Sequence, residues 1–99
     1  MPDSIRASHI LRNVDGRSKE DALKEVEDIK AAIDDGADFA DQAREHSECP
    51  SGRSGGDLGD FGRGMMVAPF EDVAFDLDVD EVSSPVETDF GYHLILRTA

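Results

Sequence analysis

The sequence predicts a single α+β domain, residues 1–99, with a small and largely antiparallel β-sheet. Two observations lead to this prediction. The length of 99 residues is that of one domain. Apolar patterns of strand and helix type follow one another in the order strand, two helices, glycine-rich segment, helix, strand, strand, and this order is typical of an α+β domain.

The first strand is expected over residues 5–14, where apolar and β-branched residues alternate imperfectly with polar ones. Asp15-Gly16 then predicts a turn. A helix follows, up to residue 35. Ser18 and Asp21 resemble a capping box at its start, with Asp in place of the preferred Glu, and Gly36 stands where a helix commonly ends. One apolar stripe, at spacings of three and four residues, consists of Ala22, Val26, Ile29 and Ile33.

A second, shorter helix is expected after Asp38, a residue type that caps helix starts. Its inner face would carry Phe39, Ala40 and Ala43.

A glycine-rich segment, residues 49–64, comes next and holds six of the nine glycines. So much glycine excludes a regular helix and indicates positive φ angles or close approach of other groups. The run is not a nucleotide-binding loop, because it lacks the Gly-Lys-Ser/Thr ending and is not followed directly by a helix.

A third helix is expected with Pro69 in its first turn. Its apolar face would consist of Phe70, Val73 and Ala74. Residues 82–87 and 92–98 then predict two strands joined by a turn at 89–91.

The net charge is −13, from 23 acidic and 10 basic residues. It excludes nucleic acid and anionic membrane surfaces as partners, because both would be repelled. The excess is compatible with adaptation to a salty interior and equally with an ordinary acidic protein. Cys49 is the only cysteine, so no intramolecular disulfide can form. The chain has no apolar run of signal-peptide or membrane-spanning length, and the expected location is cytoplasmic.

Three histidines and one cysteine leave several chemistries open. A zinc site is disfavoured, because only His46 and Cys49 have the close spacing of metal ligands. A cysteine hydrolase would pair Cys49 with His9 or His93 as its base. That alternative is disfavoured too, because Cys49 follows a predicted helix and gains nothing from a helix N-terminus. Cys49 is also interpretable as a small core residue.

An apolar cluster comes just after the glycine-rich segment and consists of Met65, Met66 and Phe70. A core position and a shallow pocket suited to a proline ring are equally compatible with this spacing.

Five motifs occur in the order of one known family. They are SHILR at 8–12, HSECPSG at 46–52, GGDLGDFGRG at 55–64, MVAPFEDVAF at 66–75 and TDFGYH at 88–93. Over nearly its whole length the sequence resembles the parvulin-type peptidyl-prolyl cis/trans isomerases. Each motif alone is weak evidence, but five in order are strong. The resemblance implies a four-stranded, mostly antiparallel sheet surrounded by three to four helices, as in parvulins and FKBP-like proteins.

The resemblance also implies a site and an activity. The catalytic residues would be His9, Cys49, Thr88 and His93, and the residues that bind proline would be Leu58, Met66, Phe70 and Phe90. The implied activity is rotation about X-Pro bonds in flexible or unfolded chains, by a monomer that needs no cofactor or metal. A proline-peptide-binding module or holdase with little turnover is the alternative. A histidine pair that merely stiffens the sheet remains open, and covalent attack by Cys49 is the less favoured role.

The sequence departs from phosphate-directed parvulins in the loop after the first strand. Those members carry a basic cluster there. Here Arg12, Arg17 and Lys19 are accompanied by acidic residues at 15, 20 and 21, so that the local charge nearly cancels. A preference for phosphoserine before proline is therefore not expected. The expected preference is for an apolar or a basic residue before proline.

Overall fold

The computed structural model describes residues 4–99. Four strands form one antiparallel sheet in the order β2-β1-β4-β3. They are β1 (Ser4–Asn13), β2 (Asp57–Gly62), β3 (Val86–Thr88) and β4 (Gly91–Arg97). The helices are α1 (Lys19–Asp34), α2 (Phe39–His46) and α3 (Ala68–Asp76), with a 3-10 turn, η1 (Pro50–Ser54), before β2. The predicted α+β class, with its four-stranded antiparallel sheet and three helices, is confirmed.

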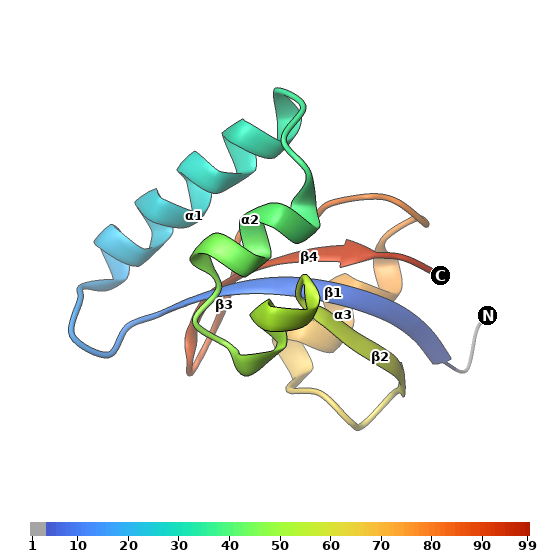
Figure 1. Ribbon diagram of the computed structural model, residues 1–99. Helices are drawn as coiled ribbons and strands as arrows, with labels where there is room; N and C mark the ends of the chain where they lie inside the picture. Colours follow the sequence, from blue (N-terminus) through green and yellow to red (C-terminus); the bar gives the residue numbers. More distant parts are fainter. Residues whose placement is uncertain (1–3) are drawn as a thin grey trace.

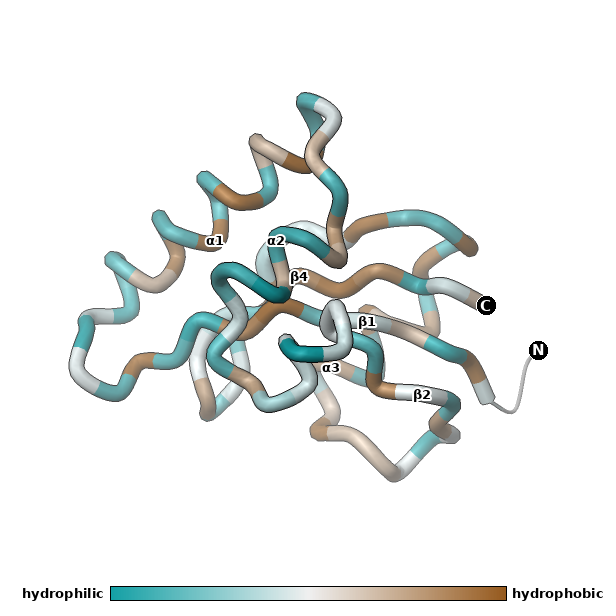
Figure 2. The backbone as a smooth tube through the Cα atoms, viewed as in Figure 1, coloured by the Kyte–Doolittle hydropathy of each residue, from teal (hydrophilic) through white to brown (hydrophobic). Residues whose placement is uncertain are grey.

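The helices cover the two faces of the sheet as separate groups: α1 and α2 lie on one face and α3 on the other (Figure 1). On the α1–α2 side the core consists of Ile10, Val26, Ile29, Phe39, Ala43 and Leu94. On the α3 side it consists of Ile5, Ala7, Phe61, Phe70, Ala74, Leu77, Val86 and Ile95. The central strands are hydrophobic along much of their length, whereas α1 is hydrophilic on its outer side (Figure 2). No helix among residues 4–99 is both long and apolar enough to cross a membrane.

The helices α1 and α2 begin where the capping residues predict. The Ser18 hydroxyl accepts a hydrogen bond from the backbone N–H of Asp21 at 3.1 Å, and the Asp38 carboxylate accepts one from Asp41 N–H at 3.1 Å. Such caps satisfy backbone donors that have no partner inside the helix. Gly36 follows α1 with φ +112°, and Pro69 lies in the first turn of α3, as expected from the sequence.

Two strands differ from the sequence pattern. The glycine-rich segment contains β2, which the pattern did not predict, because DLGDFG lacks the regular apolar alternation of a strand. The strand predicted over residues 82–87 begins only at Val86 and ends one residue later than predicted, at Thr88. Residues 82–85 do not form regular backbone pairs with β4, because the Ile95 N–H donates to the Ser83 hydroxyl at 3.0 Å and Pro85 has no N–H to donate.

Gly56 brings the glycine-rich segment into direct backbone contact with β1. The His9 N–H donates to Gly56 O at 2.9 Å. Gly56 has φ +86°, and a Cβ placed on it would lie 2.3 Å from His9 O. Only glycine fits at this position, which fixes the backbone of residue 9.

The two ends of the described chain lie side by side at the start of β1 (Figure 1). Thr98 N–H donates to Arg6 O at 2.8 Å, and Arg6 N–H donates to Ala99 O at 3.3 Å.

Candidate active site

The sheet brings His9 and His93 together from the two central strands. In the antiparallel register of β1 and β4, Leu11 is paired with His93 and His9 with Ile95. Residues two apart on a strand share a face, so both imidazoles lie on the α3 side of the sheet. Their Nδ1 atoms are 3.0 Å apart, and the rings are stacked at 5.2 Å between centroids.

Thr88 extends this pair into a chain of hydrogen bonds. Its Oγ1 lies 2.7 Å from His93 Nε2 and accepts the Phe90 N–H at 3.2 Å. One proton arrangement uses every donor except one: Thr88 O–H donates to His93 Nε2, and His93 Nδ1–H donates to His9 Nδ1. His9 Nε2 then carries the remaining proton, and among residues 4–99 it has no partner although it is buried.

Both imidazoles are neutral at pH 7. Burial, and to a smaller extent the nearby His93, lower the pKa of His9 from 6.5 to about 4. Burial likewise lowers the pKa of His93 to about 4. Desolvation disfavours the charged imidazolium, so the pair presents polar but uncharged rings to its surroundings.

Phe70 packs edge-on against both imidazoles. Its ring centroid lies 5.6 Å from that of His9 and 5.5 Å from that of His93, with interplanar angles of 78° and 81°. The side chain comes from the buried face of α3 and is 3% exposed. Phe70 is therefore part of the floor of the site.

A pocket of about 380 Å³ opens above this floor. It is lined by His9, Leu11, Cys49, Leu58, Met65, Met66, Val67, Phe70, Phe90 and His93. Within residues 4–99, none of these lining residues is an Asp, Glu, Lys or Arg. Three of them form an apolar rim that is largely exposed: Met65 (67%), Val67 (45%) and Phe90 (59%). The site therefore combines an apolar rim with a neutral polar floor.

The residues singled out from the sequence lie in or directly below this pocket. Seven of the eight line it, and Thr88 is buried beneath His93. Leu11 and Val67 line the pocket although the sequence does not predict them there, and Met65, for which the sequence allows a core or a pocket position, also lines it. Leu11 could have been found from its position two residues after His9 on the same strand face.

Cys49 lines the pocket without a hydrogen bond to either imidazole. His9 Nδ1 and both ring nitrogens of His93 make hydrogen bonds within the series His9–His93–Thr88. The remaining nitrogen, His9 Nε2, has no hydrogen-bond partner among residues 4–99. The nucleophile–base pair of a cysteine hydrolase is thus not assembled. Cys49 does follow α2, as expected, but it also immediately precedes η1. Among residues 4–99 no three metal-ligating side chains cluster together.

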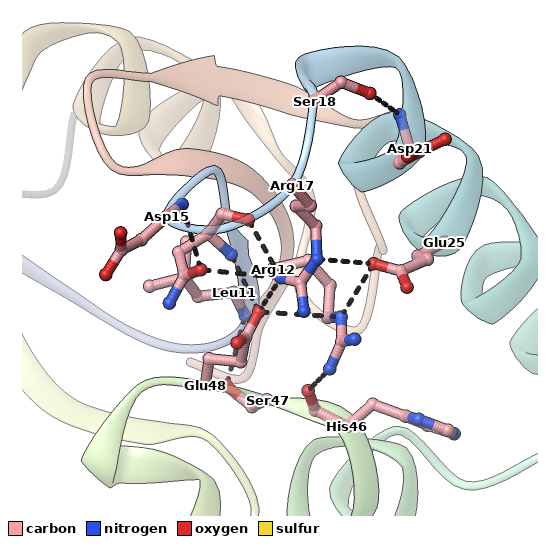
Figure 3. A network of polar contacts seen from close by, with 11 residues as sticks. Leu11, Arg12, Asp15, Arg17, Ser18, Asp21, Glu25, His46, Ser47 and Glu48 are labelled. Carbon is pink, nitrogen blue, oxygen red and sulfur yellow. Dashed lines mark hydrogen bonds and ion pairs between the residues drawn. The ribbon is translucent and has the colours of Figure 1, made fainter.

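A network of charged side chains connects β1 and α1 with Glu48, the residue before Cys49 (Figure 3). Arg12 Nε lies 3.3 Å from Glu25 Oε2 and 3.7 Å from Glu48 Oε1. Arg17 Nε lies 3.3 Å from Glu25 Oε2, and its Nη1 donates to Glu48 Oε1. The acidic partners are therefore Glu25 and Glu48, which lie farther along the chain than the residues at 15, 20 and 21 named from the sequence. Lys19 pairs with Glu87 at 3.1 Å.

Residues 9–99 match the family described as "Rotamase: PPIC-type PPIASE domain". The chain belongs to the parvulin family. This parvulin domain is 48% identical, over 99% of its length, to the peptidyl-prolyl cis-trans isomerase pin1 of Rhizopus delemar, of which it covers 63%. It is 40% identical to Pin1 of Digitalis lanata over 97% of each chain. It is 50% identical to the foldase protein PrsA of Geobacillus kaustophilus, but it spans only 31% of that relative.

Solved structures agree with this assignment. The parvulin domain superposes on the solution structure of TbPIN1 with a TM-score of 0.92 at 36% identity, over the whole of both chains. It also matches NmPin, the parvuline of Nitrosopumilus maritimus, with a TM-score of 0.78 at 40% identity, over 100% of this chain and 99% of the other.

Proposed function

We propose that this parvulin domain, residues 1–99, catalyses cis/trans isomerisation of X-Pro peptide bonds in flexible or unfolded protein segments. The observation that carries the proposal is the uncharged apolar pocket over a neutral histidine pair. A proline ring is apolar, and apolar pockets with a few convergent polar groups are typical small-ligand sites. Isomerase activity in the Pin1 relatives supports the same assignment.

The reaction makes and breaks no covalent bond. The barrier of roughly 18–20 kcal/mol comes from amide resonance, which is lost as the C–N bond twists. An enzyme needs only to bind the twisted state more tightly than either planar state. Exclusion of water favours this, because water stabilises the planar, polar amide through hydrogen bonds.

The proposed roles follow the two halves of the site. Leu58, Met66, Phe70 and Phe90 bind the proline ring and exclude water. His9, Cys49, Thr88 and His93 form the polar bed beneath it and set the polarity around the twisting amide. Since neither imidazole bonds the thiol, Cys49 acts without covalent attack.

The substrates proposed are peptides with an apolar or basic residue before proline, and phosphoserine is disfavoured. Two observations support this. Both arginines beside the pocket are already paired with carboxylates, and the chain carries a net charge of −13, which repels a phosphate dianion. We further propose that the domain acts as a cytoplasmic monomer without cofactor or metal.

Exchange spectroscopy by NMR tests the activity, because it measures cis/trans interconversion without a coupled protease. The peptides differ only in the residue before proline: leucine, arginine or phosphoserine. We expect accelerated exchange with the first two and at least about tenfold weaker acceleration with phosphoserine, because of the unfavourable field. No acceleration for any peptide would refute the isomerase proposal. Binding without acceleration would favour the holdase alternative, which the exposed apolar rim permits.

A further inference from the structure

The segment Ser47–Cys49 runs beside β1 and forms one wall of the pocket. Glu48 N–H donates to Leu11 O at 2.8 Å, and Leu11 N–H donates to Ser47 Oγ at 3.1 Å. The same hydroxyl accepts the Cys49 N–H at 3.4 Å. Leu11 and Cys49, which these bonds hold together, both line the pocket. The width of the pocket on this side therefore depends on how firmly residues 47–49 lie against β1.

The Glu48 side chain adds charge-assisted hydrogen bonds to this contact (Figure 3). Its Oε1 accepts the Asn13 N–H at 2.9 Å and a hydrogen bond from the Arg17 guanidinium, with Arg12 Nε at 3.7 Å. The side chain is 26% exposed. Burial alone would raise the pKa of Glu48, but the bonds from Arg17 and Asn13 and the charge of Arg12 hold it below its ordinary value. The carboxylate is ionised at neutral pH, and charge-assisted hydrogen bonds of this kind are strong.

We propose that Glu48 is a positioning residue, which holds the Cys49 wall of the pocket against β1. The kinetic part of this inference rests on the isomerase function proposed above. Glu48 is adjacent to Cys49 in the chain, so loss of its carboxylate loosens the wall, which the bonds of Ser47 and of the Glu48 backbone still hold. The histidine pair, held by β1 and β4, stays in place. The expected consequence is weaker substrate binding with little change in the chemical step.

Glu25 provides a matched control within the same network. It contacts the same two arginines, each at 3.3 Å, but it comes from α1. Glu48 alone of the two binds the β1 backbone, at Asn13, and adjoins the pocket wall. Replacing either residue by alanine removes one negative charge from the same pair of arginines. A larger effect in Glu48→Ala than in Glu25→Ala therefore indicates that the position of Glu48 beside the pocket wall matters. An equal effect in both indicates that only the lost charge matters.

Alkylation of Cys49 by iodoacetamide is the first readout, because Cys49 is the only thiol in the chain. The rate is measured as a function of pH, for the wild type, Glu48→Ala and Glu25→Ala, under conditions where circular dichroism shows a folded protein. A loosened wall raises the limiting rate at high pH, where the thiol is fully ionised, whereas a purely electrostatic effect moves only the midpoint. We expect the limiting rate to rise about fivefold in Glu48→Ala and to change less than about twofold in Glu25→Ala.

Steady-state kinetics with the leucine-proline peptide is the second readout. We expect KM to rise about fivefold in Glu48→Ala, with kcat within about twofold of the wild type. Equal changes in Glu48→Ala and Glu25→Ala, or no change in either readout for Glu48→Ala, would overturn the inference. If Glu48→Ala does not fold, Glu48→Gln is compared with Glu25→Gln instead. The expected rise in KM and in the limiting alkylation rate is then smaller, again in Glu48→Gln alone. Alkylation needs no turnover, so it decides the positioning role even if the wild type proves inactive.

Discussion

Near its C-terminal end, β1 carries different chemistry on its two faces. His9 and Leu11 face α3 and line a pocket without charged residues, whereas Arg12, between them and Asn13, takes part in a network with Glu25 and Glu48. Because neighbouring side chains on a strand point to opposite faces, a step of one residue separates the neutral site from the charged network. The comparison suggests a division of tasks, in which the neutral face binds substrate and the charged face fixes the position of the pocket wall.

Phe70→Ala tests the neutral face and should have the largest effect. Removal of a buried aromatic ring is expected to lower the free energy of unfolding by about 4 kcal/mol. It should also remove most activity, because Phe70 supports both imidazoles. Urea unfolding followed by circular dichroism measures the first effect, and NMR exchange measures the second.

Phe90→Ala is the control at the rim. Its side chain is 59% exposed, so the free energy of unfolding should change by less than about 0.5 kcal/mol, while KM rises. Equal loss of stability in the two variants would contradict the distinction between floor and rim.

Gly56→Ala tests the backbone contact that fixes His9. A Cβ 2.3 Å from His9 O forces the backbone to move, and we expect a loss of about 3 kcal/mol in the free energy of unfolding. Gly59→Ala is the matched variant, since Gly59 also has a positive φ, of +71°, but has open space around it. It should cost only about 1 to 2 kcal/mol. The comparison fails if Gly59→Ala is as unstable as Gly56→Ala.

The histidine pair predicts a pH dependence of stability. Folding lowers the pKa of both imidazoles from 6.5 to about 4, so the unfolded state binds more protons between these values. The stability that the two neutral imidazoles contribute is fully present above pH 6.5 and is lost as the pH falls toward 4. At about 1.4 kcal/mol per pKa unit, one uncoupled histidine accounts for about 3.5 kcal/mol. Urea unfolding at a series of pH values measures the slope.

This slope differs from that of the carboxylates. The pKa values of Glu48 and Asp57 are held below 4.5 and 3.8, so the stability that these carboxylates contribute is lost as the pH falls below those values. His93→Asn should reduce the slope between pH 6.5 and pH 4. An unchanged slope in His93→Asn would show that the pair does not cause it.

Added salt should have the smallest effect on stability, and it should act on the charged network but not on the neutral pocket. Added KCl screens the repulsion within a chain of net charge −13 and weakens the exposed ion pairs, which contribute little. We expect the free energy of unfolding to rise by roughly 1 kcal/mol toward molar KCl, while KM for an uncharged peptide does not increase. A stability that is flat in KCl would count against adaptation to high salt.

Much of the fold was predictable from local patterns. Periodicity and capping residues located β1, the three helices and β4, because those elements bury one face or stripe each. The strand β2 was not predictable in this way, since its residues are held by pairing with β1 and by the close contact of Gly56 with His9. Such contacts between distant segments leave no periodic pattern in the sequence.

The site was predictable only through the resemblance. His9 and His93 are 84 residues apart, and nothing in their local sequence indicates that β1 and β4 are neighbours. The network was anticipated in part: the sequence indicated that Arg12 and Arg17 are neutralised, but it pointed to nearby acidic residues. Glu48 reaches them because residues 47–49 fold back onto β1, which no spacing rule indicates.

The pairing of Arg6 with Thr98 and Ala99 has a consequence for how this fold can be joined to other chains. Arg6 lies beside residues 98–99, at the spacing of adjacent strands, about 5 Å, and on the side of β1 away from Leu11. A host protein can therefore receive the whole unit within a single surface loop, or the ends can be linked and the chain opened elsewhere, without moving the pocket. The match of PrsA to this chain over less than a third of its own length is compatible with such modular use.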